Sequence, residues 1–494
     1  MGKEYLEITP EMEAEWKDGE FVLFDYDCGS GKTTGIANWA VTHPAEGVLY
    51  LVPRKTLLQS VENKMAEVGA DNVTVMTIQS LAFIPQKQFL YRAYKYICID
   101  EMQQVVLDSP YNKNMGCTVT DIVHNFKGIT MMLTGTDVGI EFLFKMAYGI
   151  DVKTYRKKLG YADYLTGDVF AFVPNIGAVV DIIYKKLQKN EKVLFFSSTI
   201  ENIETVQSQL VDKDKSMVVV SEYSKHSDRL CGRKRKRVKE LIDDEVVPKG
   251  ISVVLATKAL DTGVNIKNSK DGNSSEDGDL NTVIIDSIEI ATAIQEINRR
   301  RREDGDCIDV YFLLPNGYVL KNNREKYEEE LQDYHLYQND FEAWLTKHQG
   351  KRFSNRGIVY TEPGSDGADY KIDYAYLMYC HYMLNTSLRS NYVSDYKSAV
   401  EKAMGWASVT LPSVGKKTLE ELVEYGVLST KEEKQWLIDL FAKKFRSATY
   451  LNMLLREMNL PYEIKTKVHV ELPPVNGKRK ENRSGWQLVR TDGK

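Results

Sequence analysis

The feature that most constrains the fold of this chain is a succession of short apolar runs separated by longer, polar stretches of helical character. The runs are four to six residues long and rich in Val, Ile and Phe. They do not alternate apolar with polar residues, which is typical of strands buried on both faces of a parallel sheet. Because parallel strands need crossover connections, the pattern predicts an α/β architecture. A first set comprises residues 21–25, 47–52, 73–77, 96–99 and 130–133, and a second set comprises residues 169–173, 193–196, 217–220, 252–256, 282–285 and 308–313.

Two sets of strands in tandem predict two sheets, with the join expected within residues 150–167. The length of 494 residues leaves room for a third domain, at about 150 residues per domain. After about residue 316 the strand pattern stops, and apolar residues between Tyr376 and Leu384 recur at the spacing of a buried helix face. We therefore expect lobe 1 over residues 1–155, lobe 2 over residues 160–318, a mainly helical accessory domain over residues 319–464 and a basic tail over residues 465–494.

Composition excludes several classes of protein. Hydrophobic residues make up 43% and charged residues 27% of the chain, which excludes a disordered chain or a small disulfide scaffold. No apolar run approaches the ~20 residues of a membrane-spanning helix, and the N-terminus lacks a secretory signal pattern. The scattered cysteines form no C-x-x-C pair, so we expect a cytoplasmic protein with no membrane partner. A net charge of −5 argues against simple DNA coating but does not exclude a local basic groove.

A glycine-rich loop follows the first predicted strand. Residues 28–35 read Cys-Gly-Ser-Gly-Lys-Thr-Thr-Gly, and a helical stretch comes next. Glycines allow backbone N–H groups to point at phosphates, and a helix N-terminus attracts anions. Lys32 would reach the β- and γ-phosphates and Thr33 would bind Mg²⁺, although Tyr26 replaces the usual first glycine of the pattern. The alternative is a glycine turn with an exposed lysine. The predicted nucleotide-binding residues here are Gly29, Ser30, Gly31, Lys32, Thr33 and Thr34.

An apolar run that ends in two acids supports the same chemistry. Asp100 and Glu101 follow the run at residues 96–99. In ATPases with such a loop, an aspartate at this point holds Mg²⁺, usually through water. The adjacent glutamate would act as the general base. Acids after a strand also commonly cap the next helix, but the loop upstream favours catalytic roles, with Thr33 and Asp100 as the metal-binding residues.

With these motifs in place, the chain resembles a superfamily 2 helicase over about residues 20–315. Further segments match motifs of that family in order, at residues 52–57, 77–81, 133–136, 195–198, 256–265 and 295–302. The resemblance implies two tandem RecA-like parallel-sheet lobes with ATP and Mg²⁺ bound between them. The chain does not resemble a typical DEAD-box protein, because its acidic motif reads Asp-Glu-Met-Gln and no glutamine precedes Gly31.

The resemblance also implies roles for residues of lobe 2. Gln295, Arg299 and Arg302 would complete the catalytic site that Lys32, Asp100 and Glu101 begin, with the two arginines neutralising charge on the transferred phosphoryl group. Without the preceding glutamine, the arginine run at 299–302 would read as a solvated helix face. Asp261 and Gly263 would lie beside the nucleotide.

Other family motifs imply contacts with nucleic acid and movement along it. Thr134 and Thr136 would couple hydrolysis to the motion of the lobes. Phosphates of the nucleic acid are common to every base sequence, so they are the expected contacts. The residues predicted to make them are Arg54, Thr77, Gln79, Ser80, Ser197 and Thr257.

The resemblance implies an ATP-dependent helicase or translocase that acts on nucleic acid, with single-stranded DNA expected rather than RNA. The missing glutamine motif moves the prediction from RNA helicases towards DNA replication, repair or restriction enzymes. Two alternatives stay open. One is a motor that moves on duplex DNA without unwinding it, and the other is an ATP-switched origin-binding or defence protein that recognises DNA. Partner proteins would bind through residues 319–494.

Three further segments are candidates for nucleic-acid binding. Residues 225–239 contain eight basic residues and one acid, which fits a nucleic-acid contact or a solvated helix face. Residues 411–422 resemble a helix–hairpin–helix motif, but an ordinary helical turn is also possible. The tail from Lys465 carries eight basic and three acidic residues. We expect this tail to be a flexible end, with stacking of Trp486 on a base as the alternative.

Overall fold

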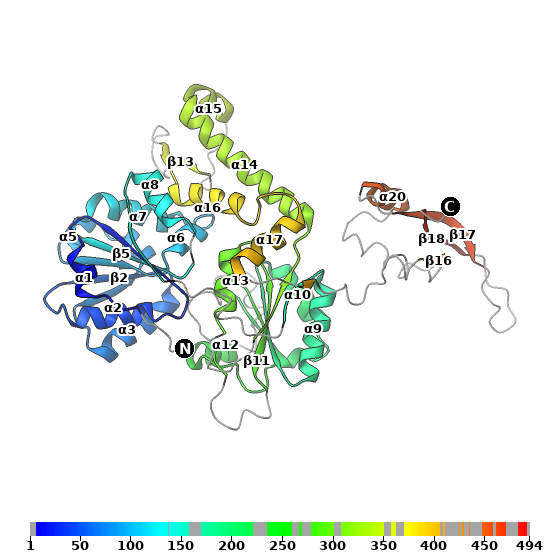
Figure 1. Cartoon of the computed structure of the whole chain (residues 1–494), viewed down its shortest axis with the longest axis horizontal. Coiled ribbons are helices and arrows are strands. Elements are labelled where there is room, and N and C mark those ends of the chain that lie inside the picture. Colours follow the sequence, from blue (N-terminus) through cyan, green and yellow to red (C-terminus); the bar gives the residue numbers. More distant parts are fainter. Residues whose placement is uncertain are drawn as a thin grey trace. The chain divides into compact units, whose positions relative to one another are not determined.

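The computed structural model describes much of the chain and divides it into two compact units. Unit 1 comprises Met1–Phe172 and Ile182–Thr410, and unit 2 comprises Val173–Asp181 and Leu411–Lys494. The described residues are 6–136, 138–157, 169–220, 235–258, 266–268, 278–300, 308–349, 357–361, 370–405, 409–410, 423, 427–428, 434, 447–457, 461–470 and 483–491. Unit 1 contains predicted lobe 1, predicted lobe 2 except Val173–Asp181, and the first part of the predicted accessory domain (Figure 1).

Lobe 1 is a parallel six-stranded sheet with strand order β3-β2-β4-β5-β1-β6. Its strands are β1 (Phe21–Tyr26), β2 (Val48–Val52), β3 (Val73–Thr77), β4 (Tyr96–Ile99), β5 (Ile129–Thr134) and β6 (Lys153–Lys157). The five predicted strands are confirmed. Strand β6 was not predicted, and it lies within the expected join, where it pairs with β1. Its sequence, Lys-Thr-Tyr-Arg-Lys, carries no apolar signal because an edge strand is only partly covered.

Helices cover both faces of this sheet (Figure 1). The pleat of a strand sends successive side chains to opposite faces, so Phe24 of β1 packs towards α2 and α3 while Leu23 packs towards α6, α7 and α8. This two-sided burial explains why the strands are apolar without alternation. The helices of lobe 1 are α1 (Pro10–Ala14), α2 (Lys32–Val41), α3 (Lys55–Val68), α4 (Ile78–Ala82), α5 (Lys87–Tyr91), α6 (Gln103–Leu107), α7 (Lys113–Asn125) and α8 (Ile140–Tyr148).

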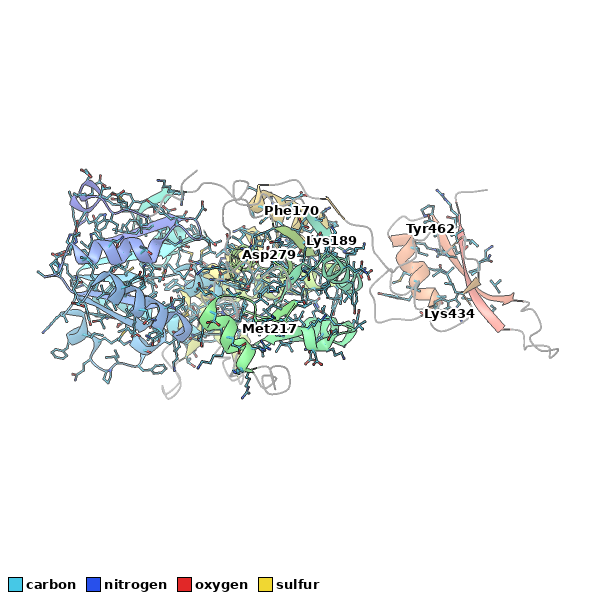
Figure 2. All side chains as sticks on the ribbon, turned by 90° about the horizontal axis from the view of Figure 1, so that it is seen from below. Phe170, Lys189, Met217, Asp279, Lys434 and Tyr462 are labelled. Carbon is cyan, nitrogen blue, oxygen red and sulfur yellow. The ribbon has the colours of Figure 1, made fainter. Side chains whose placement is uncertain are left out.

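Lobe 2 contains a seven-stranded sheet with strand order β15-β7-β12-β11-β8-β10-β9. Its strands are β7 (Phe170–Val173), β8 (Lys192–Ser197), β9 (Ser216–Val219), β10 (Val253–Ala256), β11 (Leu280–Asp286), β12 (Asp309–Leu313) and β15 (Val409–Thr410). All six predicted strands are present, and Figure 2 labels Phe170 on β7 and Met217 on β9, which lie towards opposite edges. The short strand β15 is added from far along the chain, parallel to β7. The two tandem parallel-sheet lobes are therefore confirmed.

Helices also accompany the second sheet and the region that follows it. The helical elements of lobe 2 are α9 (Ile176–Gln188), α10 (Ile200–Gln209), the 3₁₀ turn η2 (Lys213–Lys215), α12 (Arg235–Asp244) and α13 (Ile290–Ile297). The following region contains α14 (Gly317–Asn339), α15 (Phe341–His348), α16 (Tyr374–Asn385), α17 (Val393–Met404) and a hairpin of β13 (Val359–Thr361) and β14 (Tyr370–Ile372). The predicted helix face is confirmed in α16, where Tyr376, Tyr379, Cys380 and Met383 are buried. The described residues between 317 and 404 are therefore mostly helical.

Unit 2 contains a helix, α20 (Ala448–Glu457), and an antiparallel sheet in the order β16-β18-β17. The strands are β16 (Val427–Leu428), β17 (Tyr462–Val470) and β18 (Arg483–Arg490). Leu451 and Leu455 of α20 form a small core with Ile464 and Leu488. Figure 2 labels Tyr462 of this sheet.

The expectation of a flexible basic tail is therefore wrong for β17 and β18. Among the described residues, Lys465 and Lys467 lie on β17 and Arg483 and Arg490 lie on β18. Buried Ile464 and Leu488 on the same strands supply the packing that orders the hairpin. The predicted helix–hairpin–helix segment at 411–422 and most of the basic segment at 225–239 lie outside the described residues. None of the described helices combines the length and the apolar character needed to cross a membrane.

Candidate nucleotide site

The sequence-predicted nucleotide residues of lobe 1 meet at one edge of its sheet. Strands β4, β5 and β1 are consecutive neighbours, and parallel strands place their carboxyl ends on the same edge, where ligands of α/β sheets bind. A loop at residues 27–31, here called the phosphate loop, follows β1. Asp100 and Glu101 follow β4, and Thr136 follows β5. The structure thus brings together three segments that are far apart in the sequence.

The loop after β5 packs closely against the phosphate loop. A Cβ atom added to Gly135 would lie 2.6 Å from the Cys28 Sγ atom and 3.5 Å from the Lys32 Nζ atom. The short distance to the Cys28 sulfur means that a larger residue at this position would have to move the Cys28 side chain. Glycine at position 135 therefore serves the approach of the predicted coupling motif to the phosphate loop.

The phosphate loop has the backbone that anion binding requires. Gly29 and Gly31 have φ angles of 80° and 65°, in the left-handed region that glycine adopts without strain. Gly31 is the N-cap of α2 and provides no side-chain cap. A helix whose first N–H groups lack such a cap offers them to an anion, together with the favourable end of the helix dipole. These residues fit a nucleoside triphosphate.

Lys32 lies inside this loop. Its side chain is 8% exposed, and its Nζ atom donates to the carbonyl oxygens of Tyr26 at 3.0 Å and Asp27 at 2.9 Å. Tyr26, the residue that departs from the usual glycine, therefore contributes through its backbone. The alternative of an exposed lysine on a glycine turn does not agree with this burial.

The segment before β1 braces the same loop, which sequence reasoning missed. The Leu6 N–H donates to the Ser30 carbonyl at 2.9 Å. A Cβ atom added to Gly35 would lie 2.4 Å from the Leu6 carbonyl oxygen. The close approach requires glycine at the first turn of α2, and it holds the N-terminal segment across the start of that helix.

Asp100 is held in place by two neighbours. Its Oδ2 atom accepts from the Tyr50 hydroxyl at 2.8 Å, and its Oδ1 atom accepts from the Glu101 N–H at 2.9 Å. Thr33 is a second hydrogen-bonding neighbour of the Tyr50 hydroxyl. Burial, followed by the charge of Glu101, raises the pKa of Asp100 to about 6, although Tyr50 and Lys32 act in the opposite direction. Tyr50 thus connects the two predicted metal-binding residues, Thr33 and Asp100.

Two glutamines after the acids extend the site, and sequence reasoning gave them no role. Gln103 donates to the Glu101 carboxylate and accepts from the Thr134 hydroxyl at 2.7 Å. The Thr134 hydroxyl lies 2.8 Å from the Thr136 carbonyl oxygen. The general-base candidate is therefore connected to the predicted coupling motif through one side chain. The available signal was a pair of polar residues next to the acids, in a short helix that is otherwise apolar.

Lobe 2 contributes α13 and the residues that follow it. The Gln104 amide of lobe 1 donates to the Gln295 side-chain oxygen at 2.9 Å, so the predicted catalytic glutamine touches the segment after the acids. Arg299 is 8% exposed. Arg300 is 2% exposed, and its Nε atom donates to the Leu280 carbonyl at 2.7 Å, which gives it a structural role. The predicted residues Arg302, Asp261 and Gly263 lie outside the described residues.

An ion pair between half-buried Lys258 and buried Glu289 lies at the start of α13, and it too was not predicted. Lys258 lies 2.6 Å from the carboxylate of Glu289, the N-cap residue of α13. Glu289 also accepts from Thr292 at 2.7 Å and from Tyr379 of α16. Burial alone would raise the pKa of Glu289, but Lys258, Tyr379 and Thr292 outweigh it and hold that pKa below its ordinary value.

The predicted nucleic-acid contacts of lobe 1 are mostly engaged within the protein. Arg54 pairs with Asp108 at 2.5 Å. Thr77 is buried, and its hydroxyl accepts from the Ser80 N–H at 3.0 Å as the N-cap of α4. Gln79 donates to the Pro53 carbonyl at 2.8 Å. Ser80 has an exposed side chain.

The predicted contacts of lobe 2 divide in the same way. Ser197 is fully buried and its hydroxyl donates to Asp286 at 2.5 Å, so its side chain is engaged within lobe 2. Ser198, the first residue after β8, is exposed. Thr257 follows β10 and is half-buried.

No protein-family model matches the sequence, and no curated protein matches it significantly. Among solved structures, the helicase Lhr of Mycobacterium smegmatis bound to single-stranded DNA and AMP-PNP is similar, with 15% identity, a TM-score of 0.44 and coverage of 61% of this chain and 45% of Lhr. The DUF1998 helicase MrfA bound to DNA and AMPPNP has 15% identity and a TM-score of 0.43, with coverage of 62% and 48%. Dbp5 of S. cerevisiae bound to RNA and ADP BeF3 has 12% identity and a TM-score of 0.42, with coverage of 59% and 79%.

The chain thus matches about half the length of the first two of these structures. Identity and TM-scores at this level do not decide an activity. The chemistry of the chain has to be judged from its own residues.

Proposed function

We propose that this protein is an ATPase of the superfamily 2 helicase type, which uses ATP hydrolysis between its lobes to move along nucleic acid. The observation that carries the proposal is the meeting of Lys32, Asp100 and Glu101 at one sheet edge. The Gln104–Gln295 hydrogen bond adds a direct connection to α13.

The phosphate loop would bind the triphosphate. The N–H groups at the start of α2 and the left-handed Gly29 and Gly31 suit the phosphate oxygens. Lys32 would exchange its two carbonyl partners for the β- and γ-phosphates, because an anion is a stronger partner for an ammonium group. Thr33 and Asp100 would hold Mg²⁺, which, when bound, neutralises charge on the phosphates.

Glu101 is the proposed general base. Its carboxylate would accept the proton of the water that attacks the terminal phosphoryl group. Gln103 donates to that carboxylate, which orients it for this role. The oxygen of the same Gln103 amide accepts from the Thr134 hydroxyl. A movement of Glu101 on loss of the terminal phosphate would therefore move Thr134 of the coupling motif.

Hydrolysis would change the preference between two arrangements of the lobes. Gln295 and Arg299 lie at and just beyond the end of α13, so lobe 2 would contact the nucleotide only when the lobes are close. A ligand shifts an equilibrium only by contacts that differ between its states, and loss of the γ-phosphate removes such contacts. Single-stranded DNA is the proposed track, because the glutamine motif of the RNA-directed branch is missing from the sequence.

The rate of ATP hydrolysis, measured in parallel with single-stranded DNA, duplex DNA and RNA, tests the proposal. We expect single-stranded DNA to stimulate the rate most, and the Lys32→Ala variant to lose hydrolysis while it still binds the strand. Hydrolysis by purified Lys32→Ala protein at the wild-type rate would refute the assigned site. Absence of stimulation by all three nucleic acids would refute the motor, and a strand-displacement assay would distinguish unwinding from translocation on duplex DNA.

A further inference from the structure

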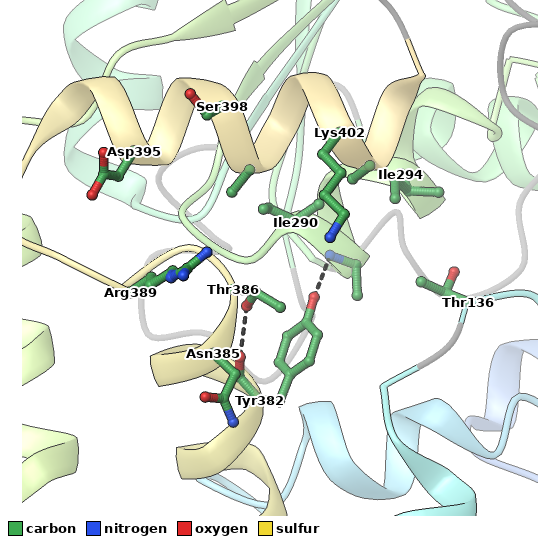
Figure 3. A pocket seen from close by; sticks show the side chains of 13 residues that line it. Thr136, Ile290, Ile294, Tyr382, Asn385, Thr386, Arg389, Asp395, Ser398 and Lys402 are labelled. Atoms are coloured by element: carbon green, nitrogen blue, oxygen red, sulfur yellow. Dashed lines mark hydrogen bonds between the residues drawn. The ribbon is translucent and has the colours of Figure 1, made fainter.

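A groove outside the nucleotide site lies where α13, α16 and α17 meet the coupling motif (Figure 3). Its volume is about 620 Å³, within the range of about 300–1,000 Å³ that holds small organic groups. Thr136 lines it from lobe 1, and Ile290 and Ile294 line it from α13. Residues of the phosphate loop and the acids Asp100 and Glu101 are not among its described lining residues, so it is distinct from the candidate nucleotide site.

Two cations on the helical side give the groove its chemistry. Arg389, after α16, and Lys402, on α17, both line the groove with exposed side chains. Neither side chain forms an ion pair or hydrogen bond with another residue in the part of the chain that the structure describes. Other exposed lysines are paired, such as Lys145 with Asp151 at 2.7 Å. Asp395 also lines the groove, so these three residues together carry one net positive charge.

The other residues that line the groove are apolar or carry hydrogen-bonding groups. Ile290, Ile294 and Ala399 form an apolar wall, and Asn385 and Ser398 supply an amide and a hydroxyl. Figure 3 shows Lys402 reaching from α17 towards the Tyr382 hydroxyl. Cations beside an apolar wall and polar groups suit a repeating unit that has an anionic phosphate and a less polar sugar and base.

We propose that this groove binds the phosphodiester backbone of a single nucleic-acid strand, with phosphates at Arg389 and Lys402. The proposal rests on the proposed function as a nucleic-acid motor and adds a contact surface outside the motifs. Both cations are exposed and available, whereas several motif residues predicted to touch nucleic acid are buried or paired within lobe 1.

The position of the groove connects strand binding to the ATPase. The Ala291 N–H, in the first turn of α13, donates to the Tyr382 hydroxyl in the groove at 2.9 Å. The same helix carries Gln295, which touches Gln104 of lobe 1. A strand in the groove would therefore contact Thr136 and the helix that carries a proposed catalytic residue, and it would stimulate hydrolysis by favouring one arrangement of the lobes.

The test compares wild-type protein with the double variant Arg389→Ala/Lys402→Ala. Binding of fluorescein-labelled oligo(dT) and oligo(U) is measured by anisotropy over a range of salt concentrations. Loss of two phosphate contacts should lower strand affinity on the order of tenfold at physiological salt and reduce the slope of log affinity against log salt by about 1.4. ATP binding and unstimulated hydrolysis should stay at wild-type levels. The charge-conserving variant Arg389→Lys/Lys402→Arg should restore most of the strand affinity.

Lys321→Ala provides the matched control, because Lys321 is an exposed lysine of α14 outside the groove lining. It should retain strand affinity and salt slope. The inference is overturned if the double variant binds strands as the wild type does, if Lys321→Ala loses as much affinity, or if only free mononucleotide binding depends on the two cations. A wild-type protein that neither binds strands nor hydrolyses ATP would instead refute the proposed function. If nucleic acid stimulates hydrolysis by the wild-type protein and the double variant still binds strands as tightly as the wild type, only the proposed role of the groove is refuted.

Discussion

Each of the two sheets has a buried acid and a lysine near its carboxyl edge. The acid and the lysine form an ion pair only in lobe 2. In lobe 1, Asp100 and Lys32 are buried beside an open phosphate loop, and their partners are a hydroxyl and backbone groups. In lobe 2, Glu289 and Lys258 neutralise each other and receive support from Tyr379 of the helical region. The first edge is arranged to receive a charged ligand, and the second is arranged to hold a helix in place.

The pKa values of the two acids express this difference. Burial raises the pKa of Asp100 to about 6, because no close cation compensates fully for the lost solvation. Glu289 is equally hidden from water, yet its pKa stays below its ordinary value because Lys258 lies against it. A buried carboxylate without a full counter-charge costs stability. A raised pKa of this kind is common at functional sites, and it agrees with the proposed role of Asp100 in holding Mg²⁺.

The largest effect on this comparison is expected from Glu101→Gln. The change keeps the shape of the side chain and removes the proton acceptor, so ATP hydrolysis should fall by about 10²–10⁴-fold while ATP still binds. Hydrolysis and nucleotide binding are measured on the same preparation. Glu67→Gln, an exposed residue of α3, is the control and should behave as the wild type. Equal hydrolysis by both variants would remove the chemical distinction between the two edges.

Breaking the pair of lobe 2 should destabilise the protein without acting on chemistry directly. Glu289→Ala removes the acceptor of Thr292 and Tyr379 and the counter-charge of half-buried Lys258, and should lower the free energy of unfolding by about 1–3 kcal/mol. The surface pair Lys145–Asp151 provides the control, because Asp151→Asn should cost less than about 1 kcal/mol. Urea unfolding followed by circular dichroism measures both. Equal, small losses would show that the lobe 2 pair does not fix α13.

Tyr50→Phe should sharpen the metal assignment in lobe 1. It removes a hydrogen bond to a charged carboxylate, a loss of about 1.5–3 kcal/mol. The Mg²⁺ concentration for half-maximal hydrolysis should therefore rise by roughly tenfold or more, while binding of nucleotide without Mg²⁺ stays the same. Tyr96→Phe is the control, because its hydroxyl lies 3.4 Å from Glu13 and away from Asp100. An unchanged Mg²⁺ requirement would argue against Tyr50 as a positioning residue.

The smallest effect is expected at the contact between the edges. Gln104→Ala and Gln295→Ala remove the two partners of one neutral hydrogen bond. A double-mutant cycle on strand-stimulated hydrolysis should therefore give a coupling energy of about 0.5–1.5 kcal/mol. Purely additive effects would mean that this bond does not connect the lobes during the cycle.

Much of the fold could be predicted because its signals are local. The strands of both lobes are short apolar runs, and burial on both sheet faces makes such runs visible in the sequence. The strands that were not predicted lack such a local apolar signal. Strand β6 is a polar edge strand and β15 has two residues. Strands β17 and β18 combine basic residues with a small apolar core that forms only when the hairpin packs against α20.

In the candidate site, too, the features made by one continuous segment could be predicted, and the contacts between distant segments could not. Gly29, Gly31 and Lys32 could be recognised because a phosphate loop is made by one continuous segment. The hydrogen bond from Tyr50 to Asp100 joins residues on different strands, and nothing in the sequence near either residue indicates it. The burial of Ser197 depends on the covering of both faces of β8, and its hydroxyl donates to Asp286 on the neighbouring strand β11.

The sequence by itself determined most strands of the two lobes, the phosphate loop and the identity of the acids, because each depends on residues that are neighbours along the chain. Only the tertiary structure decided that β5 separates β4 from β1, that Gln103 joins Glu101 to Thr134, and that Lys258 neutralises Glu289. The physical reason is that hydrogen bonds and ion pairs act over a few ångströms in space. The packing of the strands and helices sets those distances, and spacing along the chain does not.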